Sequence, residues 1–271
     1  MPTSGLSRDK IMVRVVAGAA ALVSFLALMA GSAFAAGSSF VVPAAMDTKE
    51  VHMPGDYFAQ PVIVVHAGDT VTWINDDSVK HSVVSFPGLP VDFHLELDAG
   101  KSGTFQFDQP GVYRYYSDQQ ATYGKMMDDA KADKGTGVYP APMRGAVVVL
   151  DGNDGLPASS SATVDIPGDS MKFTPWALVV KAGDTVTWTN HDDDMLHMVS
   201  SVPDHAAAAI PPISLPAATG TGTFTFTQAG VYYYYCPVHA SYKADEGILY
   251  PLESYGMFPY LMDGIVIVTP N

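Results

Sequence analysis

The stretch GTFTFTQAGVYYYYCPVH, residues 222–239, carries the features that decide the fold and the chemistry of the chain. GTFTFT alternates Thr with Phe, and GVYYYY joins Val to four aromatic residues; both patterns are typical of β-strands. The pair Ala229–Gly230 between them is a turn signal. Cys236, the only cysteine, ends the second predicted strand, and His239 follows three residues later. The stretch therefore predicts two strands that bring a thiol and an imidazole to one loop.

The same pattern occurs twice in the chain. GTFQFDQPGVYRYYS (103–117) matches GTFTFTQAGVYYYYC (222–236), and VVHAGDTVTWIND (64–76) matches VVKAGDTVTWTNH (179–191). Internal similarity of this kind indicates two tandem units. Their length and their short punctuated strands predict an all-β fold of two Greek-key β-sandwich domains, residues 40–150 and 162–271. The Gly/Ser/Pro/Asp-rich segment DGNDGLPASSS (151–161) is the predicted linker.

The N-terminus has the pattern of an export signal. A basic segment (1–14) precedes an apolar run that ends near Ala30, and the small residues of GSAFAAG (31–37) follow. This predicts a signal peptide, residues 1–35, cleaved after Ala35; an uncleaved membrane anchor is the alternative. No later apolar run is long enough to span a membrane. We therefore expect the mature chain in the periplasm or outside the cell.

The charge of the chain limits its partners. Removal of residues 1–35 leaves 11 basic and 27 acidic residues, a net charge of −16. This charge argues against nucleic acid and anionic lipid as partners. It fits docking to a basic protein, and it fits a merely solvated acidic surface equally well.

The second repeat contains four residues of types that bind copper. His197 follows the predicted strand TVTWTN (185–190), Cys236 and His239 form C-x-x-H, and Met262 opens the last predicted strand. A thiolate and two imidazoles with a weak axial thioether are the ligand set of blue, or type 1, copper sites that transfer electrons. Cys236 and His239 share a loop and can converge on one ion, whereas His197 must arrive from a distant strand. These four residues predict one copper ion per chain.

The motifs TNHDDDMLHMV (189–199), GVYYYYCPVH (230–239) and MDGIVIV (262–268) resemble those of the cupredoxins of the plastocyanin, amicyanin and pseudoazurin kind. The resemblance covers most of residues 162–271 and, more weakly, residues 40–150. It implies a β-sandwich, one type 1 copper and one-electron transfer to a redox partner protein. It also implies that His239 lies nearer the surface, as the exit for the electron, and that His197 is the inner anchor.

One departure from the family pattern concerns the axial ligand. The family places Met a few residues after the second His, but here 22 residues (240–261) separate His239 from Met262. Loops of this length in compact domains are usually functional or mobile, so the insertion is interpreted as a lid or docking surface; a decorative excursion is the alternative. Met257, Glu253 and Glu246 are alternatives to Met262 as the axial ligand.

The first repeat has lost part of the ligand set. His81 and Met143 match the His and Met of the second repeat, but Ser117 stands at the position of the Cys and Gln120 at that of the second His. Ser and Gln are poor copper ligands beside thiolate and imidazole, so no type 1 site is expected in residues 40–150. A different metal site that combines His81 with His94 or Met143 is the alternative.

These features favour an exported electron carrier over an enzyme. A two-domain copper oxidase or nitrite reductase is one alternative, but it needs a second copper that is held by further histidines, often as H-x-H, and no H-x-H occurs in the chain. A periplasmic copper-handling protein is the other alternative. It would bind exchangeable copper mainly through Met and His, whereas this chain has a Cys in the set.

Overall fold

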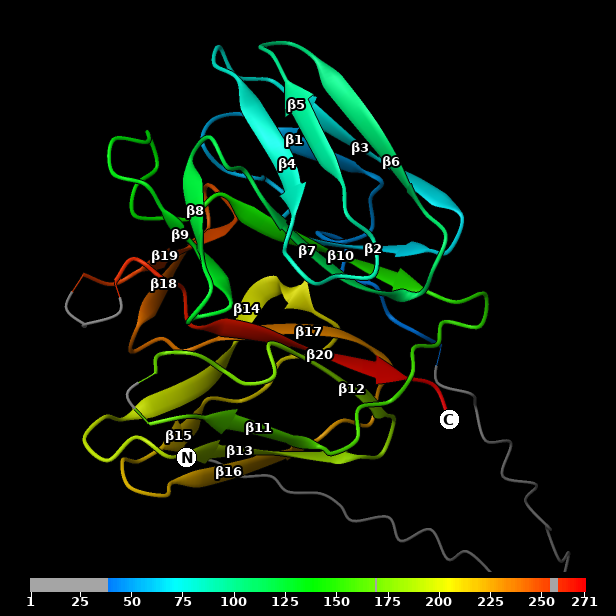
Figure 1. Ribbon diagram of the computed structural model, residues 1–271. Coiled ribbons are helices and arrows are strands. Elements are labelled where there is room, and N and C mark those ends of the chain that lie inside the picture. Colours follow the sequence, from blue (N-terminus) through cyan, green and yellow to red (C-terminus); the bar gives the residue numbers. More distant parts are fainter. Residues whose placement is uncertain (1–38, 169, 254–257) are drawn as a thin grey trace, which may run out of the picture. The chain divides into compact units, whose positions relative to one another are not determined.

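The computed structural model describes residues 39–168, 170–253 and 258–271. Residues 37–271 form the second of two units of the chain; the first, with the predicted signal peptide, lies outside the described residues. Every regular element described in the second unit is a β-strand (Figure 1). Within this described part, no helix has the length and apolar character needed to cross a membrane. The predicted all-β class is confirmed.

The first repeat, residues 40–150, forms a three-stranded sheet of order β1–β3–β6 and a five-stranded sheet of order β2–β10–β7–β4–β5. A hairpin, β8–β9, is added to them. The strands are β1 (Glu50–Met53), β2 (Val62–His66), β3 (Asp69–Asn75), β4 (His81–Ser85), β5 (His94–Leu97), β6 (Ser102–Phe107), β7 (Gly111–Tyr116), β8 (Ala121–Gly124), β9 (Asp129–Ala132) and β10 (Arg144–Leu150).

The second repeat, residues 162–271, forms the same two sheets in the same order, β11–β13–β16 and β12–β20–β17–β14–β15, and the hairpin β18–β19. The strands are β11 (Thr163–Ile166), β12 (Ala177–Lys181), β13 (Thr185–Asn190), β14 (His197–Ala206), β15 (Ile213–Leu215), β16 (Thr221–Thr225), β17 (Gly230–Tyr235), β18 (Ala240–Lys243), β19 (Ile248–Pro251) and β20 (Asp263–Thr269).

A buried core lies between the two sheets of each repeat. In the second repeat, Val186 and Trp188 point inward from β13, and Tyr232 and Tyr234 point inward from β17. Their spacing by two residues follows from the alternation of side chains along a strand. The Trp188 and Tyr234 rings pack edge to face, with centroids 5.7 Å apart. This β-sandwich confirms the expected fold class.

The outer faces of the two five-stranded sheets are buried as well. Every residue of β10 and of β20 is buried, because their outward side chains pack against those of the other repeat in a shared apolar cluster. Tyr233 and Ile267 belong to this cluster from one side, and Val64 and Val148 from the other. A strand that is covered on both faces has a nearly continuous apolar sequence, which accounts for the runs AVVVL and IVIV. The division into domains at 40–150, 151–161 and 162–271 stays a prediction.

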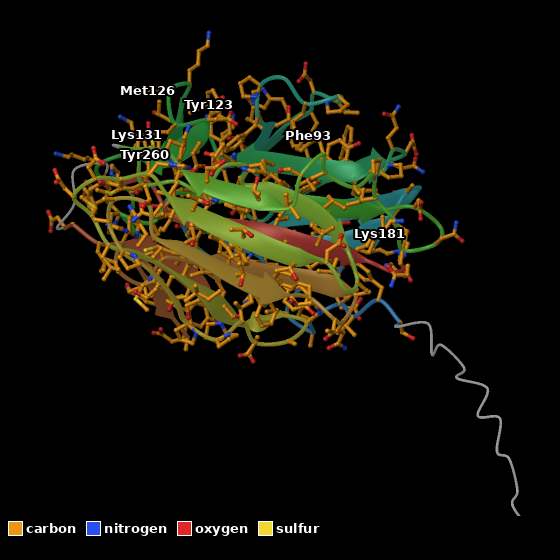
Figure 2. The ribbon with its side chains drawn as sticks, turned by 90° about the horizontal axis from the view of Figure 1, so that it is seen from below. Phe93, Tyr123, Met126, Lys131, Lys181 and Tyr260 are labelled. Carbon is orange, nitrogen blue, oxygen red and sulfur yellow. The ribbon has the colours of Figure 1, made fainter. Side chains whose placement is uncertain are left out.

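The long insertions of both repeats fold into hairpins that reach the other repeat. Ile248 and Tyr250 of β19 pack with Ala141 and Tyr57 of the first repeat. In the opposite direction, the β8–β9 hairpin presents the carbonyl of Met126 to Lys172 Nζ at 3.3 Å. Figure 2 shows Tyr123, Met126 and Lys131 of the first insertion at the same end of the molecule as Tyr260 of the second. The described residues of the insertion thus form contacts between the repeats. Its interpretation as a lid or docking surface stays a prediction.

Candidate metal centre

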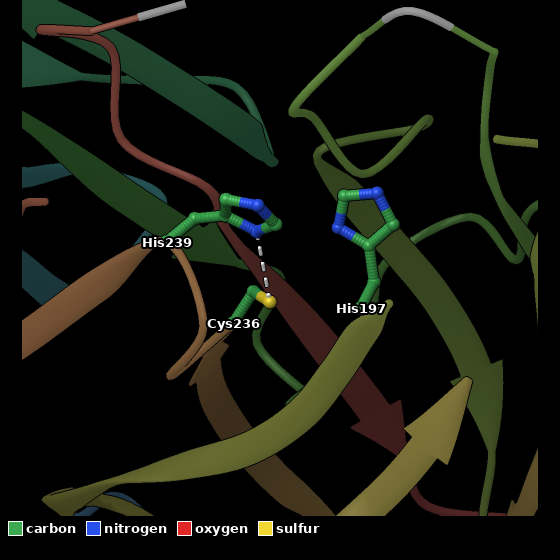
Figure 3. A group of neighbouring side chains, drawn as sticks. All are labelled: His197, Cys236 and His239. Atoms are coloured by element: carbon green, nitrogen blue, oxygen red, sulfur yellow. Dashed lines mark hydrogen bonds between the residues drawn. The ribbon is translucent and has the colours of Figure 1, made fainter. Parts of the chain in front are cut away.

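Cys236 is held at the end of β17 by backbone hydrogen bonds. Its N–H donates to Met262 O at 3.0 Å, which ties it to the start of β20. Its own carbonyl accepts from the N–H groups of His239 and Ala240 at 3.0 and 2.9 Å, so the segment Cys-Pro-Val-His closes into a tight turn. This turn places His239 Nδ1 3.3 Å from Cys236 Sγ (Figure 3).

His197 reaches the same place from the start of β14. It pairs with Leu215 of β15, and its side chain is fully buried. Its ring centroid lies 4.7 Å from that of His239, and Figure 3 shows both rings on either side of the thiol. Ligand atoms of His197, Cys236 and His239 all lie within 4.8 Å of one another. The structure therefore brings together three of the four residues that the sequence singled out.

Asp192 lies behind the outer nitrogen of His197. Its carboxylate Oδ2 is 3.5 Å from His197 Nε2, and Asp192 is itself buried. Asn190, at the end of β13, fixes this loop because its Oδ1 accepts from the Asp192 N–H at 2.9 Å and its Nδ2 donates to Met195 O at 2.8 Å. A carboxylate beside the outer nitrogen of an imidazole favours the tautomer with a proton there, which leaves Nδ1 free to bind a metal.

Burial keeps the three side chains uncharged in the absence of a metal. It lowers the pKa of His239 to about 4, with a smaller contribution from the neighbouring His197. It also lowers the pKa of His197, an effect that Asp192 partly offsets. Burial raises the pKa of the Cys236 thiol, although the Met198 N–H, 3.3 Å from Sγ, opposes this effect. Both imidazoles therefore have lone pairs to offer at neutral pH, whereas the thiol must lose its proton to an incoming metal.

These residues fit a copper ion by the chemistry of their donors. Both ring nitrogens of His197 are buried and have no hydrogen-bond partner among the described residues, and buried polar atoms of this kind need a reason. One soft sulfur and two imidazole nitrogens in a dry site suit copper.

Met262 is close to the group through its backbone. It is fully buried in the same apolar core as Cys236. Of the other candidates for the axial position, Glu246 accepts a hydrogen bond from the Tyr250 hydroxyl, and Glu253 is exposed. Neither glutamate belongs to the group formed by His197, Cys236 and His239. Met257 lies outside the described residues. The axial role of Met262 stays a prediction.

His239 and His197 are both buried. His239 is 3% exposed and His197 is 0% exposed, so the role of His239 as the exit for the electron stays a prediction. The outer nitrogen of His239, Nε2, lies 3.1 Å from Met195 Sδ. Met195 belongs to the loop between β13 and β14 and is half-buried. Contacts of Met195 and Asp192 with the centre were not predicted from the sequence; the one signal is their place in the loop that leads to His197.

In the first repeat, a closed set of hydrogen bonds occupies the equivalent place. The Ser117 hydroxyl donates to Gln120 Oε1 at 2.5 Å and accepts from the Ser82 N–H at 3.0 Å. Gln120 Nε2 donates to Lys80 O at 3.2 Å. These groups satisfy one another and supply no thiolate.

His94 is not part of the group of His, Cys, Asp and Glu side chains that the described residues form around His81, and the pairing of His81 with Met143 stays a prediction. His94 is exposed on β5, with Nε2 4.0 Å from Asp118. Met143 is buried in the core between the sheets, and its carbonyl accepts from the Ser117 N–H at 3.0 Å. The group that the described residues form around His81 contains Asp56 and Asp77 instead.

Known proteins similar to this chain are copper proteins. The family of copper-binding proteins that includes plastocyanin and azurin matches residues 160–244, which contain His197, Cys236 and His239. Amicyanin-alpha of Methylorubrum extorquens is 33% identical over 107 residues, which are 38% of this chain and 87% of that protein.

Solved structures that match part of this chain include an amicyanin and a cupredoxin. The amicyanin of Paracoccus versutus is 26% identical, covers 42% of this chain and 84% of its own, and has a TM-score of 0.28. A purple cupredoxin from Nitrosopumilus maritimus is 23% identical, covers 37% of this chain and 97% of its own, and has a TM-score of 0.27.

Proposed function

This chain belongs to the plastocyanin/azurin family of copper-binding proteins, and from that premise we propose that it is an electron carrier with one type 1 copper ion in its second repeat. His197, Cys236 and His239 are the equatorial ligands in this proposal, and Met262 is the axial ligand. The single observation that carries it is the convergence of a buried thiol and two buried imidazoles within 4.8 Å. When bound, copper supplies one-electron chemistry by alternating between two oxidation states.

The chain holds these ligands on a rigid part of the fold. β20, β17 and β14 are neighbours in one sheet, and they position Met262, Cys236 and His197 respectively. Because both faces of β20 and most of β17 are buried, the ligand positions have little freedom to move. Little movement between two charge states means a small energetic cost for each electron transferred, which suits a carrier.

The exclusion of water adds to this rigidity. All three ligand side chains are at most 3% exposed, so the change in charge is met by fixed protein dipoles such as the Met198 N–H at the thiol. Preorganised dipoles of this kind need no reorganisation when the charge changes.

A redox partner protein is proposed for the exchange of electrons. The charge of −16 expected for residues 36–271 favours a partner with a basic surface. Export to the periplasm or outside the cell is part of the proposal and rests on the sequence of residues 1–35 alone.

Addition of Cu²⁺ to the purified apoprotein tests the proposal through visible absorption and electron paramagnetic resonance. We expect one intensely coloured copper per chain with a type 1 spectrum. Cys236→Ser should lose the colour, whereas His81→Ala, at the matched position of the first repeat, should keep it. A colour that survives Cys236→Ser, or disappears in His81→Ala, would contradict the assignment.

The carrier proposal is separated from an enzyme by turnover. An electron carrier exchanges electrons with a protein partner and does not consume a small substrate. Steady reduction of nitrite or oxygen by the copper-loaded protein, or a second copper needed for activity, would replace the carrier with a copper oxidoreductase.

A further inference from the structure

Two parallel strands of the first repeat end side by side and place two carboxylates together. β1 and β3 are parallel neighbours, with Met53 opposite Asn75 at their carboxyl ends. Asp56 follows β1 and Asp77 follows β3, so both lie at the same edge of the sheet. Asn75 fixes the second loop, because its Oδ1 accepts from the Asp77 N–H at 3.0 Å.

His81 completes the group from the start of β4. Its side chain is fully buried, and its Nε2 lies 3.1 Å from Asp77 Oδ2. Ligand atoms of Asp56, Asp77 and His81 all lie within 4.8 Å of one another. His81 Nδ1 is buried without a hydrogen-bond partner among the described residues. No type 1 ligand set competes for this imidazole, since Ser117 and Gln120 bond to each other.

The charge of the group is not balanced by the protein. No lysine or arginine in the described part of the chain forms an ion pair with Asp56 or Asp77; the only ion-pair contact of either is the one between Asp77 and His81. Asp56 Oδ2 accepts from the Gly137 N–H, and Asp77 Oδ1 accepts from the Ser78 N–H. Both carboxylates are half-buried, so a cation could reach them and keep water in its remaining positions.

We propose that Asp56, Asp77 and His81 form a second metal site, for a divalent cation of the Zn²⁺ class, in the repeat that lacks the type 1 ligands. Two carboxylate oxygens and one imidazole nitrogen are hard to borderline donors that suit this class and not Cu⁺. Zn²⁺ bonds of about 2.0–2.2 Å place ligands roughly 3–4 Å apart, so the group needs only small side-chain movements. Binding displaces the proton that Nε2 shares with Asp77.

The second repeat uses the equivalent pair in another way. Asp192 and His197 stand where Asp77 and His81 stand, with 3.5 Å between Oδ2 and Nε2. There His197 Nδ1 faces Cys236 and His239 (Figure 3), and Nε2 faces the aspartate. The counterpart of Asp56, Asp169 in the repeated PGD motif, lies outside the described residues. The same carboxylate–imidazole pair thus serves as support in one repeat and as ligands in the other.

Titration of the copper-loaded protein with Zn²⁺, followed by calorimetry and metal analysis after gel filtration, tests the proposal. We expect one Zn²⁺ per chain in addition to copper. Asp56→Asn and Asp77→Asn, which keep the side-chain shape, should each weaken Zn²⁺ binding by at least about tenfold. Asp98→Asn, at an exposed aspartate of the same repeat, should leave it unchanged, and an unaltered copper spectrum shows that each variant is folded.

The Cys236→Ser variant separates this site from the copper centre. It should still bind one Zn²⁺, and that binding should still depend on Asp77. The proposal is overturned if no Zn²⁺ binds beyond the copper, if both Asp→Asn variants bind as the wild type does, or if Cys236→Ser abolishes Zn²⁺ binding. None of these results depends on whether the copper centre transfers electrons.

Discussion

Arg144 and Asp263 stand at equivalent positions of the two repeats, and their side chains meet at 2.6 Å in the buried contact between the five-stranded sheets. Each directly follows a Met and opens the last strand of its repeat. Tyr233 and Trp176 also donate to the Asp263 carboxylate, at 2.6 and 3.0 Å. Burial alone would raise the pKa of Asp263, but Arg144 and these donors hold it below its ordinary value. The same position therefore carries an arginine in one repeat and an aspartate in the other, and the two side chains form an ion pair across the contact.

Arg144→Ala is expected to destabilise the protein strongly. It leaves Asp263 buried without its guanidinium partner, a change that typically costs about 3–5 kcal/mol. Denaturant unfolding of the apoprotein measures the loss. Lys80→Ala removes an exposed ion pair with Glu96 and should leave the unfolding midpoint unchanged, because exposed pairs contribute little. Equal midpoints for the two variants would show that the buried pair has no structural importance.

Asp192→Asn should weaken copper binding without abolishing the type 1 spectrum. The amide removes the negative charge beside His197 Nε2, so the imidazole becomes a poorer donor, and about a 10–100-fold loss of affinity is expected. The reduction potential should rise, because the oxidised ion gains more from a nearby negative charge than the reduced ion does. Competition titration and voltammetry measure both effects. Asp193→Asn, at the exposed neighbouring residue, is the control, and identical shifts in both variants would exclude a positioning role for Asp192.

Copper affinity should increase about tenfold per pH unit through the neutral range. The pKa of Cys236 is raised above its ordinary value, so the free thiol carries a proton that the metal must displace. Both imidazoles have lowered pKa values and are already neutral there. Near pH 4, where His239 becomes protonated, the dependence should steepen to more than one proton per copper. Competition titrations from pH 4 to 8 give this slope, and a flat profile in the neutral range would mean that the thiol is ionised in the apoprotein.

Met195→Ala should raise the pKa of His239 from about 4 toward the ordinary value. Burial is the main cause of its low pKa, and Met195 Sδ lies against Nε2, so truncation lets water reach the ring. His239 disfavours folding when only the unfolded state is protonated, and the apoprotein therefore loses stability as the pH falls from about 6.5 toward 4. If the pKa of His239 in the folded state lies closer to its ordinary value, the apoprotein loses less stability as the pH falls.

Nuclear magnetic resonance titration of the apoprotein gives the His239 pKa directly. Met195→Leu, which keeps the apolar volume, should stay close to the wild type. An unchanged His239 pKa in Met195→Ala would show that groups other than Met195 keep water from the ring.

The sequence predicted the fold and most of the candidate centre from local patterns. Alternation along strands such as TVTWTN marks one buried face, and C-x-x-H on a single turn requires Cys236 and His239 to meet. His197 joins them because its strand, β14, neighbours β17 in the sheet.

The remaining features arise from contacts that a local pattern does not encode. The burial of Tyr233 depends on the other repeat, and the burial of His239 depends on packing around its loop. The grouping of Asp56 with Asp77 follows from the parallel pairing of β1 with β3, which connects residues that are distant along the chain.

The packing of each repeat's hairpin against the other repeat has a consequence for the engineering of this molecule. The segment that begins directly after His239 rests on Tyr57 and Ala141 of the repeat without a thiolate. The first repeat thus helps to fix the loop that follows the proposed copper ligand His239. Deletion of the first repeat would remove packing contacts of this loop. Substitutions in the first repeat, far from Cys236, are therefore expected to shift the absorption of the proposed copper centre.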